Sequence, residues 1–402
     1  MSTMTREEML KFLEENDGLL NLQPIFIPRR FCKPGYRLRL HPDDYYAFGM
    51  ERGAIKERWF SSVICAMNGD KAKPDEGLSY VNIDGNPDHK VSLKDFVDTL
   101  GADLIGQELF DRYGTWPMYS KFFDYSDPLF HHLHLGFEDA ARVGKLGKPE
   151  AYYYSPQMNN YAGNFPHTYF GFAPDVTKEE VRERLLHFTE AYTRITELSR
   201  AYRIQLGTGW YTAPGVIHAP GSYLTYEPQW NSDVNSVFEN VVNGEIFGQS
   251  FLDENLPPED MGNVDKVMSL LDWEKNVDPD YRKHYFRPPV TLTEDENHIQ
   301  KQVVYGNPYI AARELTVLPG KTVTVRDESA YGFIIVQGYG RIQNHDAATA
   351  TMLRFGQFSQ DEFFVSADRA ANGVTFENHS KCEPLVLLKH YPSREGYTPA
   401  ER

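Results

Sequence analysis

The alternation of apolar and polar residues predicts a chain made mainly of short β-strands, with helices at a few defined places. Short segments rich in aromatic and β-branched residues recur between turn residues, as is typical of strands. A first helix is predicted near the N-terminus. There Thr5 and Glu8 form a capping box ahead of apolar residues at helical spacing, which continue to about Glu15.

A second helical segment is predicted between strands, within residues 175–203. Thr177 and Glu180 form another capping box, and apolar residues from Val181 to Leu198 keep the period of a helix. The charged residues on the other face are typical of a solvated surface. We therefore expect a helical insert that interrupts the first group of strands.

Strand-like segments return from about residue 300, with turns at roughly ten-residue spacing. The predicted fold class is mainly β with an α insert, built as two barrels, and 402 residues suffice for two cores. We expect the second barrel to bind no metal, because it lacks a His-x-His pair. The expected parts are an N-terminal helix (1–24), a first barrel with the insert (25–255), linker helices (256–299) and a second barrel (300–402).

Composition narrows the classes of partner. The formal net charge of −16 disfavours nucleic acid or another polyanion as a partner. No apolar run reaches the roughly 18 residues of a membrane span, and the charged N-terminus is unlike a secretory signal. The three cysteines are widely spaced, which favours a reducing compartment over a disulfide framework. We therefore expect a cytoplasmic protein with a small-molecule partner.

The candidate chemistry begins at His132-Leu133-His134. Side chains alternate along a strand, so these two imidazoles point to the same side and can share one divalent metal. Glu150 could add a carboxylate oxygen, and His218, which follows the turn at Pro214-Gly215, a third nitrogen. Nitrogen and oxygen ligands suit zinc, manganese or iron(II) and do not choose among them.

Further motifs follow in a fixed order between residues 40 and 245. They are Glu57-Arg58-Trp59, His132-Leu133-His134, Lys148-Pro149-Glu150, Gly171-Phe172, Pro214-Gly215-Val216-Ile217-His218-Ala219 and Glu227-Pro228-Gln229-Trp230-Asn231-Ser232-Asp233.

In this order the motifs resemble those of the class I (type I) mannose-6-phosphate isomerases, a family of the cupin superfamily. The resemblance implies two cupin (jelly-roll) barrels, the first of which binds one divalent ion, with zinc expected ahead of manganese or iron. It also implies roles for nine side chains. They are the metal ligands His132, His134, Glu150 and His218, the acid–base residues Lys148 and Glu227, and the substrate-binding residues Trp59, Asn231 and Asp233.

Two positions depart from the family pattern. The family has a glutamine ligand where this chain has His132, and three histidines with one glutamate are also typical of metal-dependent cupin oxygenases and decarboxylases. An arginine that the family places a few residues beyond Asp233 falls near Val237, and no arginine stands nearby. The sequence therefore leaves open whether the sugar is phosphorylated.

The function that the resemblance implies is a metal-dependent aldose–ketose isomerase, acting on a sugar or sugar phosphate by proton transfer through an enediol. Two alternatives remain: a three-histidine, one-glutamate dioxygenase or decarboxylase, and a non-catalytic sugar-binding cupin. The expected partner is a small-molecule sugar, with no nucleic acid and no membrane, and a homodimer is one possible assembly.

Overall fold

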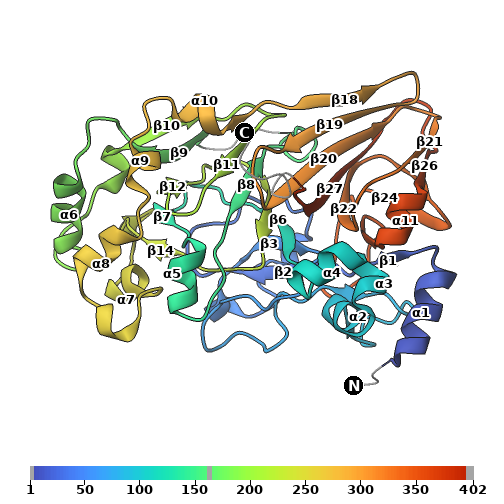
Figure 1. Ribbon diagram of the computed structural model, residues 1–402, viewed down its shortest axis with the longest axis horizontal. Helices are drawn as coiled ribbons and strands as arrows, with labels where there is room; N and C mark the ends of the chain where they lie inside the picture. Colours follow the sequence, from blue (N-terminus) through green and yellow to red (C-terminus); the bar gives the residue numbers. More distant parts are fainter. Residues whose placement is uncertain (1–3, 161–164, 395–402) are drawn as a thin grey trace.

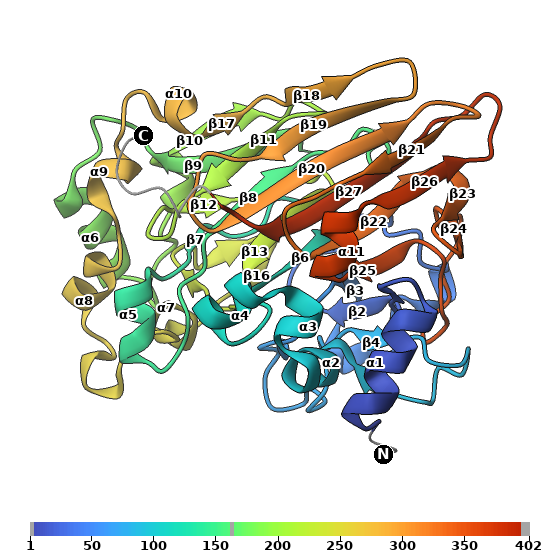
Figure 2. The same cartoon turned by 45° about the vertical axis from the view of Figure 1, so that its right-hand side comes forward.

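Large antiparallel sheets form the middle of the molecule. In residues 4–160 and 165–394, which the computed structural model describes, two seven-stranded sheets lie face to face (Figures 1 and 2). Sheet I consists of β17 (Phe286–Arg287), β11 (Gly209–Thr212), β8 (Glu150–Tyr153), β13 (Thr225–Trp230), β6 (Met118–Phe123), β3 (Ile55–Phe60) and β2 (Ile25–Pro28). Sheet II consists of β1 (Leu19–Asn21), β25 (Glu362–Val365), β22 (Tyr331–Gln337), β27 (Leu385–Pro392), β20 (Ile310–Val317), β19 (His298–Val304) and β18 (Val290–Glu294).

A smaller sheet covers the other face of each large sheet. Sheet III covers sheet I, with the ring of Phe170 5.1 Å from that of Trp210, and sheet IV covers sheet II, with Phe376 6.1 Å from Phe333. Sheet III consists of β10 (Ser199–Arg203), β9 (His167–Phe172), β12 (His218–Ala219), β7 (His132–Leu133) and β14 (Ser236–Val237). Sheet IV consists of β21 (Thr322–Val325), β26 (Val374–Asn378), β23 (Tyr339–Ile342) and β24 (His345–Ala348). Two hairpins pair β15 (Val241–Val242) with β16 (Glu245–Ile246) and β4 (Tyr80–Val81) with β5 (Val91–Ser92).

Helices gather at the two ends of the layered sheets (Figure 1). One end holds α5 (Phe137–Arg142), α6 (Lys178–Leu186), α7 (Gln249–Asp253), α8 (Val264–Ser269) and α9 (Trp273–Asn276), and the other holds α1 (Arg6–Glu15), α2 (Leu93–Leu100), α3 (Ala102–Ile105), α4 (Gln107–Tyr113) and α11 (Ala367–Asn372). The remaining helices are α10 (Tyr281–Tyr285) and the 3-10 turns η1 (Pro42–Asp44), η2 (Met50–Arg52), η3 (Ile195–Glu197) and η4 (Pro258–Asp260). None of the helices that the structure describes has the length and apolar character needed to cross a membrane.

Sheet I is buried on both faces because it lies between sheets II and III. All six residues of β6 are buried, although they include Ser120 and Lys121. Neighbouring side chains on this strand point to opposite faces. On the face toward sheet III, Lys121 meets Glu227 of the neighbouring strand β13. Ser120 points toward sheet II, where its hydroxyl lies 2.9 Å from Nδ1 of His390. Polar residues on sheet I therefore sit inside the molecule on either face.

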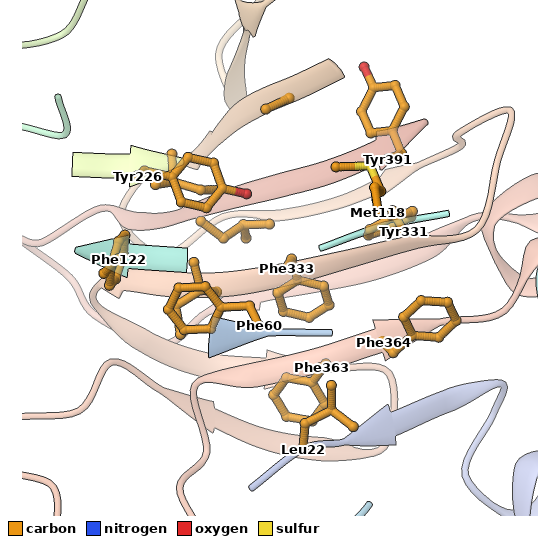
Figure 3. Packing of buried hydrophobic residues seen from close by; sticks show 14 of the residues in the cluster. Leu22, Phe60, Met118, Phe122, Tyr226, Tyr331, Phe333, Phe363, Phe364 and Tyr391 are labelled. Atoms are coloured by element: carbon orange, nitrogen blue, oxygen red, sulfur yellow. The ribbon is translucent and has the colours of Figure 1, made fainter. Parts of the chain in front are cut away.

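The layer between sheets I and II is largely aromatic (Figure 3). The rings of Phe60 and Phe122 are 4.9 Å apart and nearly perpendicular, a favourable edge-to-face arrangement. Arg58 is also buried in this layer and donates to both oxygens of Asp361 at 2.8 Å and to Glu362 at 3.1 Å. A buried guanidinium of this kind is tolerated because two carboxylates balance its charge and accept from both of its terminal nitrogens.

The N-terminal helix agrees with the sequence prediction. Thr5 and Glu8 form the predicted capping box of α1, which ends at Glu15. The rest of the expected N-terminal part is not helical, since β1 pairs with β25 at the edge of sheet II. Residues 1–3 and 395–402 of the expected first and last parts lie outside the described residues, and the four-part division of the chain stays a prediction.

The predicted continuous helix within residues 175–203 is wrong in its second half. Helix α6 ends at Leu186, and residues Ser199–Arg203 form the edge strand β10, which pairs with β9. The ring of Tyr202 lies 4.7 Å from that of Trp210 on sheet I. Strand pairing and ring packing with distant residues outweigh the local helical periodicity here.

The expected linker of helices is also partly wrong. It contains α8, α9 and α10, but β17 then pairs with β11 in sheet I, and β18 pairs with β19 in sheet II. This segment therefore supplies one edge strand to each of the two large sheets: β17 to sheet I and β18 to sheet II.

We predict that His390 makes the stability of the fold depend on pH. Burial lowers the pKa of His390 to about 3, whereas an unfolded histidine titrates near about 6.5. The folded protein therefore keeps His390 neutral while the unfolded chain takes up a proton. This contribution to stability is complete above about pH 6.5 and is lost as the pH falls toward 3, at up to about 1.4 kcal/mol per pH unit.

The measurement is the free energy of unfolding in denaturant between pH 7 and 4, for the wild type, His390→Gln and the exposed control His379→Gln. We expect a shallower pH dependence for His390→Gln alone. An unchanged slope would show that His390 does not contribute.

Candidate metal centre and charged cavity

Three imidazoles from sheet III converge on one point. β12 pairs antiparallel with β7 so that His218 lies directly opposite His132, and His134 follows at the end of β7. The ring centroids are 4.2 Å apart for His132 and His218 and 4.9 Å apart for His134 and His218. One nitrogen from each of the three lies within 4.8 Å of the others, close enough for a shared ion.

The Pro214-Gly215 turn brings His218 into this position. Gly215 has a φ of +76°, a conformation that residues with a side chain rarely adopt. A Cβ on Gly215 would also come within 2.9 Å of the backbone nitrogen of Asp272. The Gly215 N–H donates to the carbonyl of His134 at 2.8 Å, which ties the turn to the histidine pair.

Each of the three histidines is oriented through Nδ1. Nδ1 lies 3.0 Å from the carbonyl of Phe130 in His132, 2.6 Å from that of Val234 in His134, and 2.9 Å from that of Val216 in His218. A carbonyl can only accept, so each Nδ1 carries the proton and Nε2 is left as a free lone pair. Burial lowers the pKa of His132, and it lowers that of His134 to about 3. These two rings are therefore neutral and ready to act as ligands.

Glu150, the first residue of β8 on sheet I, faces the imidazoles. Its Oε2 lies 3.0 Å from Nε2 of His134 and its Oε1 lies 3.3 Å from Nε2 of His218. Glu150 Oε1 and His218 Nε2 are buried without a hydrogen-bond partner. A divalent cation would satisfy both, and three nitrogens with one carboxylate fit zinc, manganese or iron.

Beside this centre lies a cavity whose lining includes His132, His134 and Glu150. Lys148, just before β8, places Nζ 3.2 Å from Nε2 of His134, 3.0 Å from Oε2 of Glu150 and 3.5 Å from Oε1 of Glu227. Burial and the nearby Glu150 raise the pKa of Glu227 to about 8. The two residues predicted as acid–base groups are thus brought together next to the predicted ligands.

The three predicted substrate-binding residues lie in different places. Asp233 lines the cavity, and its carboxylate accepts from Nη2 of Arg29 at 3.1 and 3.2 Å. Trp59 and Asn231 do not line it. Trp59 donates from Nε1 to Glu57 at 2.9 Å, and Asn231 donates to the carbonyl of Trp116. Trp59 thus contacts a wall residue of the cavity from behind, whereas the partner of Asn231 lies outside the lining, and the role of all three stays a prediction.

The sequence alone assigned no role to three charged residues that line the cavity: Arg29, Glu57 and Lys121. Lys121 lies 3.2 Å from Glu227, and Arg29 Nε donates to Glu57 at 2.8 Å. Burial would lower the pKa of Lys121, but the Glu227 and Glu57 carboxylates reverse the effect and raise it. A charged residue inside a largely apolar strand was the available signal for Lys121, and the motif Glu57-Arg58-Trp59 was the signal for Glu57. Arg29 follows β2, and nothing in its local sequence marks it.

Comparisons with known proteins agree with this architecture. No protein-family model and no curated protein matches the sequence. Among solved structures, the chain is similar to the mannose 6-phosphate isomerase from Bacillus subtilis, with 16% identity, a TM-score of 0.62, and 93% of this chain and 99% of that chain covered. It is also similar to a mannose 6-phosphate isomerase with zinc and yttrium bound (12% identity, TM-score 0.58, 93% and 99% covered). The apo enzyme from Salmonella typhimurium gives 11% identity and a TM-score of 0.60, with 93% and 99% covered.

The chain has the fold of these isomerases. At such low identities the likeness concerns the fold alone, and it agrees with the mainly β, cupin-like architecture predicted from the motifs.

We predict that His218→Ala abolishes metal binding. Losing even an outer partner of a ligand typically costs about 10–100-fold in metal affinity, so losing a ligand should cost more than about 100-fold. The measurement is Zn²⁺ affinity by calorimetry, with metal content determined after dialysis. The matched control is His187→Ala, an exposed histidine on the surface next to α6. A His218→Ala protein with wild-type affinity would contradict the ligand assignment.

Proposed function

We propose that this protein is a metal-dependent aldose–ketose isomerase acting on a small sugar. The observation that carries the proposal is the position of Lys148 and Glu227, which are 3.5 Å apart and directly beside the three histidines and Glu150. Moving a proton between two adjacent sugar carbons needs a base and an acid close to a group that stabilises an oxyanion. The similarity of the fold to mannose 6-phosphate isomerase structures also supports an isomerase function.

His132, His134, Glu150 and His218 would hold the ion. We favour zinc because the donor set suits it and a similar structure has zinc bound. When bound, a divalent ion polarises a carbonyl oxygen and stabilises the negative charge of an enediolate. We further propose that sheets I and III form one cupin barrel around this centre, and that sheets II and IV form the second.

The protein's own residues handle the proton. Oε1 of Glu227 lies between two ammonium groups, 3.2 Å from Lys121 and 3.5 Å from Lys148. We assign Glu227 Oε1 to accept the proton from one sugar carbon and return it to the adjacent carbon, and Lys148 Nζ to pass a proton from the oxygen of one of these carbons to the oxygen of the other. Phe123, Phe130 and Tyr152 line the same cavity and give it apolar surface beside the pair.

The direct test is a screen of metal-loaded protein against free and phosphorylated hexoses and pentoses, with ketose and aldose products resolved by NMR. Conversion in both directions supports the proposal. Metal-loaded protein that converts none of them would refute it.

One observation favours a second candidate, a metal-dependent oxygenase or decarboxylase, because three imidazoles and one carboxylate also suit iron or manganese in such enzymes. The charged pair Lys148 and Glu227 favours the isomerase instead. Oxygen consumption or CO₂ release by iron-loaded protein would distinguish the two.

We predict that Lys148→Met leaves the metal bound but lowers turnover by about 10²–10⁴-fold, the usual contribution of one acid–base group. Lys145→Met is the matched control. Lys145 lies three residues upstream, contacts Asn255 at 2.9 Å and does not line the cavity. Steady-state kinetics and metal content are measured on the same samples. Wild-type turnover in Lys148→Met would remove this residue from the mechanism.

A further inference from the structure

Each cationic side chain among the described residues that line the cavity is already paired with carboxylates. Lys148 lies 3.0 Å from Glu150, and Lys121 lies 3.2 Å from Glu227. Arg29 lies 2.8 Å from Glu57 and, at Nη2, 3.1 Å from Asp233. The cavity therefore offers a ligand no lysine or arginine that lacks a carboxylate at contact distance.

Arg29 is held in this arrangement from all sides. Its Nε and Nη2 donate to the two oxygens of Glu57, Nη2 also donates to Asp233, and Nη1 donates to the carbonyl of Met67 at 3.4 Å. The carboxylates are fixed in turn. Glu57 accepts from Trp59 and Tyr125, and Asp233 accepts from the backbone N–H of Met67 at 2.9 Å. The guanidinium cannot turn toward a ligand without breaking several charge-assisted hydrogen bonds.

Carboxylates also outnumber the cationic side chains that line the cavity. Three cations, Arg29, Lys121 and Lys148, share the cavity with four carboxylates, those of Glu57, Glu150, Glu227 and Asp233. Each of the three cations therefore has at least one of these carboxylates at contact distance. A phosphate group that approached Arg29, Lys121 or Lys148 would bring about two further negative charges next to the carboxylates that already hold these cations, and like charges in contact are unfavourable.

We propose that the substrate is an unphosphorylated sugar, and that Glu57 and Asp233 set this specificity by engaging Arg29. This inference rests on the proposed isomerase function. Sugar hydroxyls both donate and accept, so they match a wall on which carboxylates alternate with ammonium and guanidinium groups. Phe31, Phe123 and Phe130 add apolar surface for the C–H faces of a sugar ring.

The first experiment compares D-mannose with D-mannose 6-phosphate, and other free hexoses and pentoses with their phosphates, by kcat/KM of the metal-loaded wild type. We expect the free sugars to be preferred by about 100-fold or more, since each buried charge left unpaired or facing a like charge costs about one to two powers of ten. A preference for the phosphorylated sugars would overturn the inference and leave the isomerase function intact.

A binding measurement separates the two proposals. Calorimetry with D-mannitol and D-mannitol 1-phosphate, which cannot be isomerised between aldose and ketose, reports recognition without turnover. Binding of the neutral polyol alone, with no conversion of any sugar, would sustain this inference and refute the proposed function. Preferential binding of the phosphate would refute the inference whatever the activity.

The variant Asp233→Asn tests the assigned residues. It removes one carboxylate from Arg29, and we expect the ratio of kcat/KM for phosphorylated over free sugar to rise by about 10-fold or more. The matched control is Asp265→Asn, which removes an exposed partner of Arg182 on the surface and should leave the ratio unchanged. An unchanged ratio in a folded, metal-binding Asp233→Asn protein would show that Asp233 does not set the specificity.

Discussion

The burial of sheet I on both of its faces is the constraint on which the rest of the structure depends. A charged side chain on the inner strands of this sheet has little access to bulk water, so it persists only where other charges and hydrogen bonds satisfy it. On the face toward sheet II, Arg58 meets Asp361 and Glu362. On the face toward sheet III, Glu57, Lys121, Glu150 and Glu227 line one cavity. The same physical requirement thus produces an ion pair within the core on one side and a candidate active site on the other.

The metal centre obeys the same rule with neutral groups. The three imidazoles come from sheet III and donate their Nδ1 protons to backbone carbonyls, so that free Nε2 lone pairs face Glu150 across the gap between the sheets. Acceptors gathered in this way repel one another, and burial adds to the cost because no water can donate to them. A divalent ion relieves both effects. Binding of the ion would therefore also hold sheet III against sheet I.

The charged cavity combines two properties that an isomerase of neutral sugars would need. Lys148 and Glu227 provide groups that exchange protons beside the metal ligands. Arg29, Glu57 and Asp233 form a closed set of ion pairs that presents fixed donors and acceptors. Such a wall is preorganised, since its side chains are held by packing and by backbone N–H groups before any ligand arrives. The fold is shared with mannose 6-phosphate isomerases, whereas the pairing of Arg29 belongs to this chain's own side chains.

The sequence by itself determined the elements whose signals are local. The capping box of α1 depends on residues three positions apart, and the spacing of His132 and His134 follows from strand alternation, so both could be predicted. The family-like motifs also pointed to Lys148, Glu150, His218 and Glu227. The tertiary structure decided which of these meet, because convergence depends on the register of β7 with β12 and on the packing of sheet III against sheet I. It also decided the end of α6, the strand β10 and the pairing of Arg29 with Asp233, 204 positions away. Contacts at such separations leave no trace in local periodicity, since their energy comes from hydrogen bonds and ion pairs that form only when distant segments are buried together.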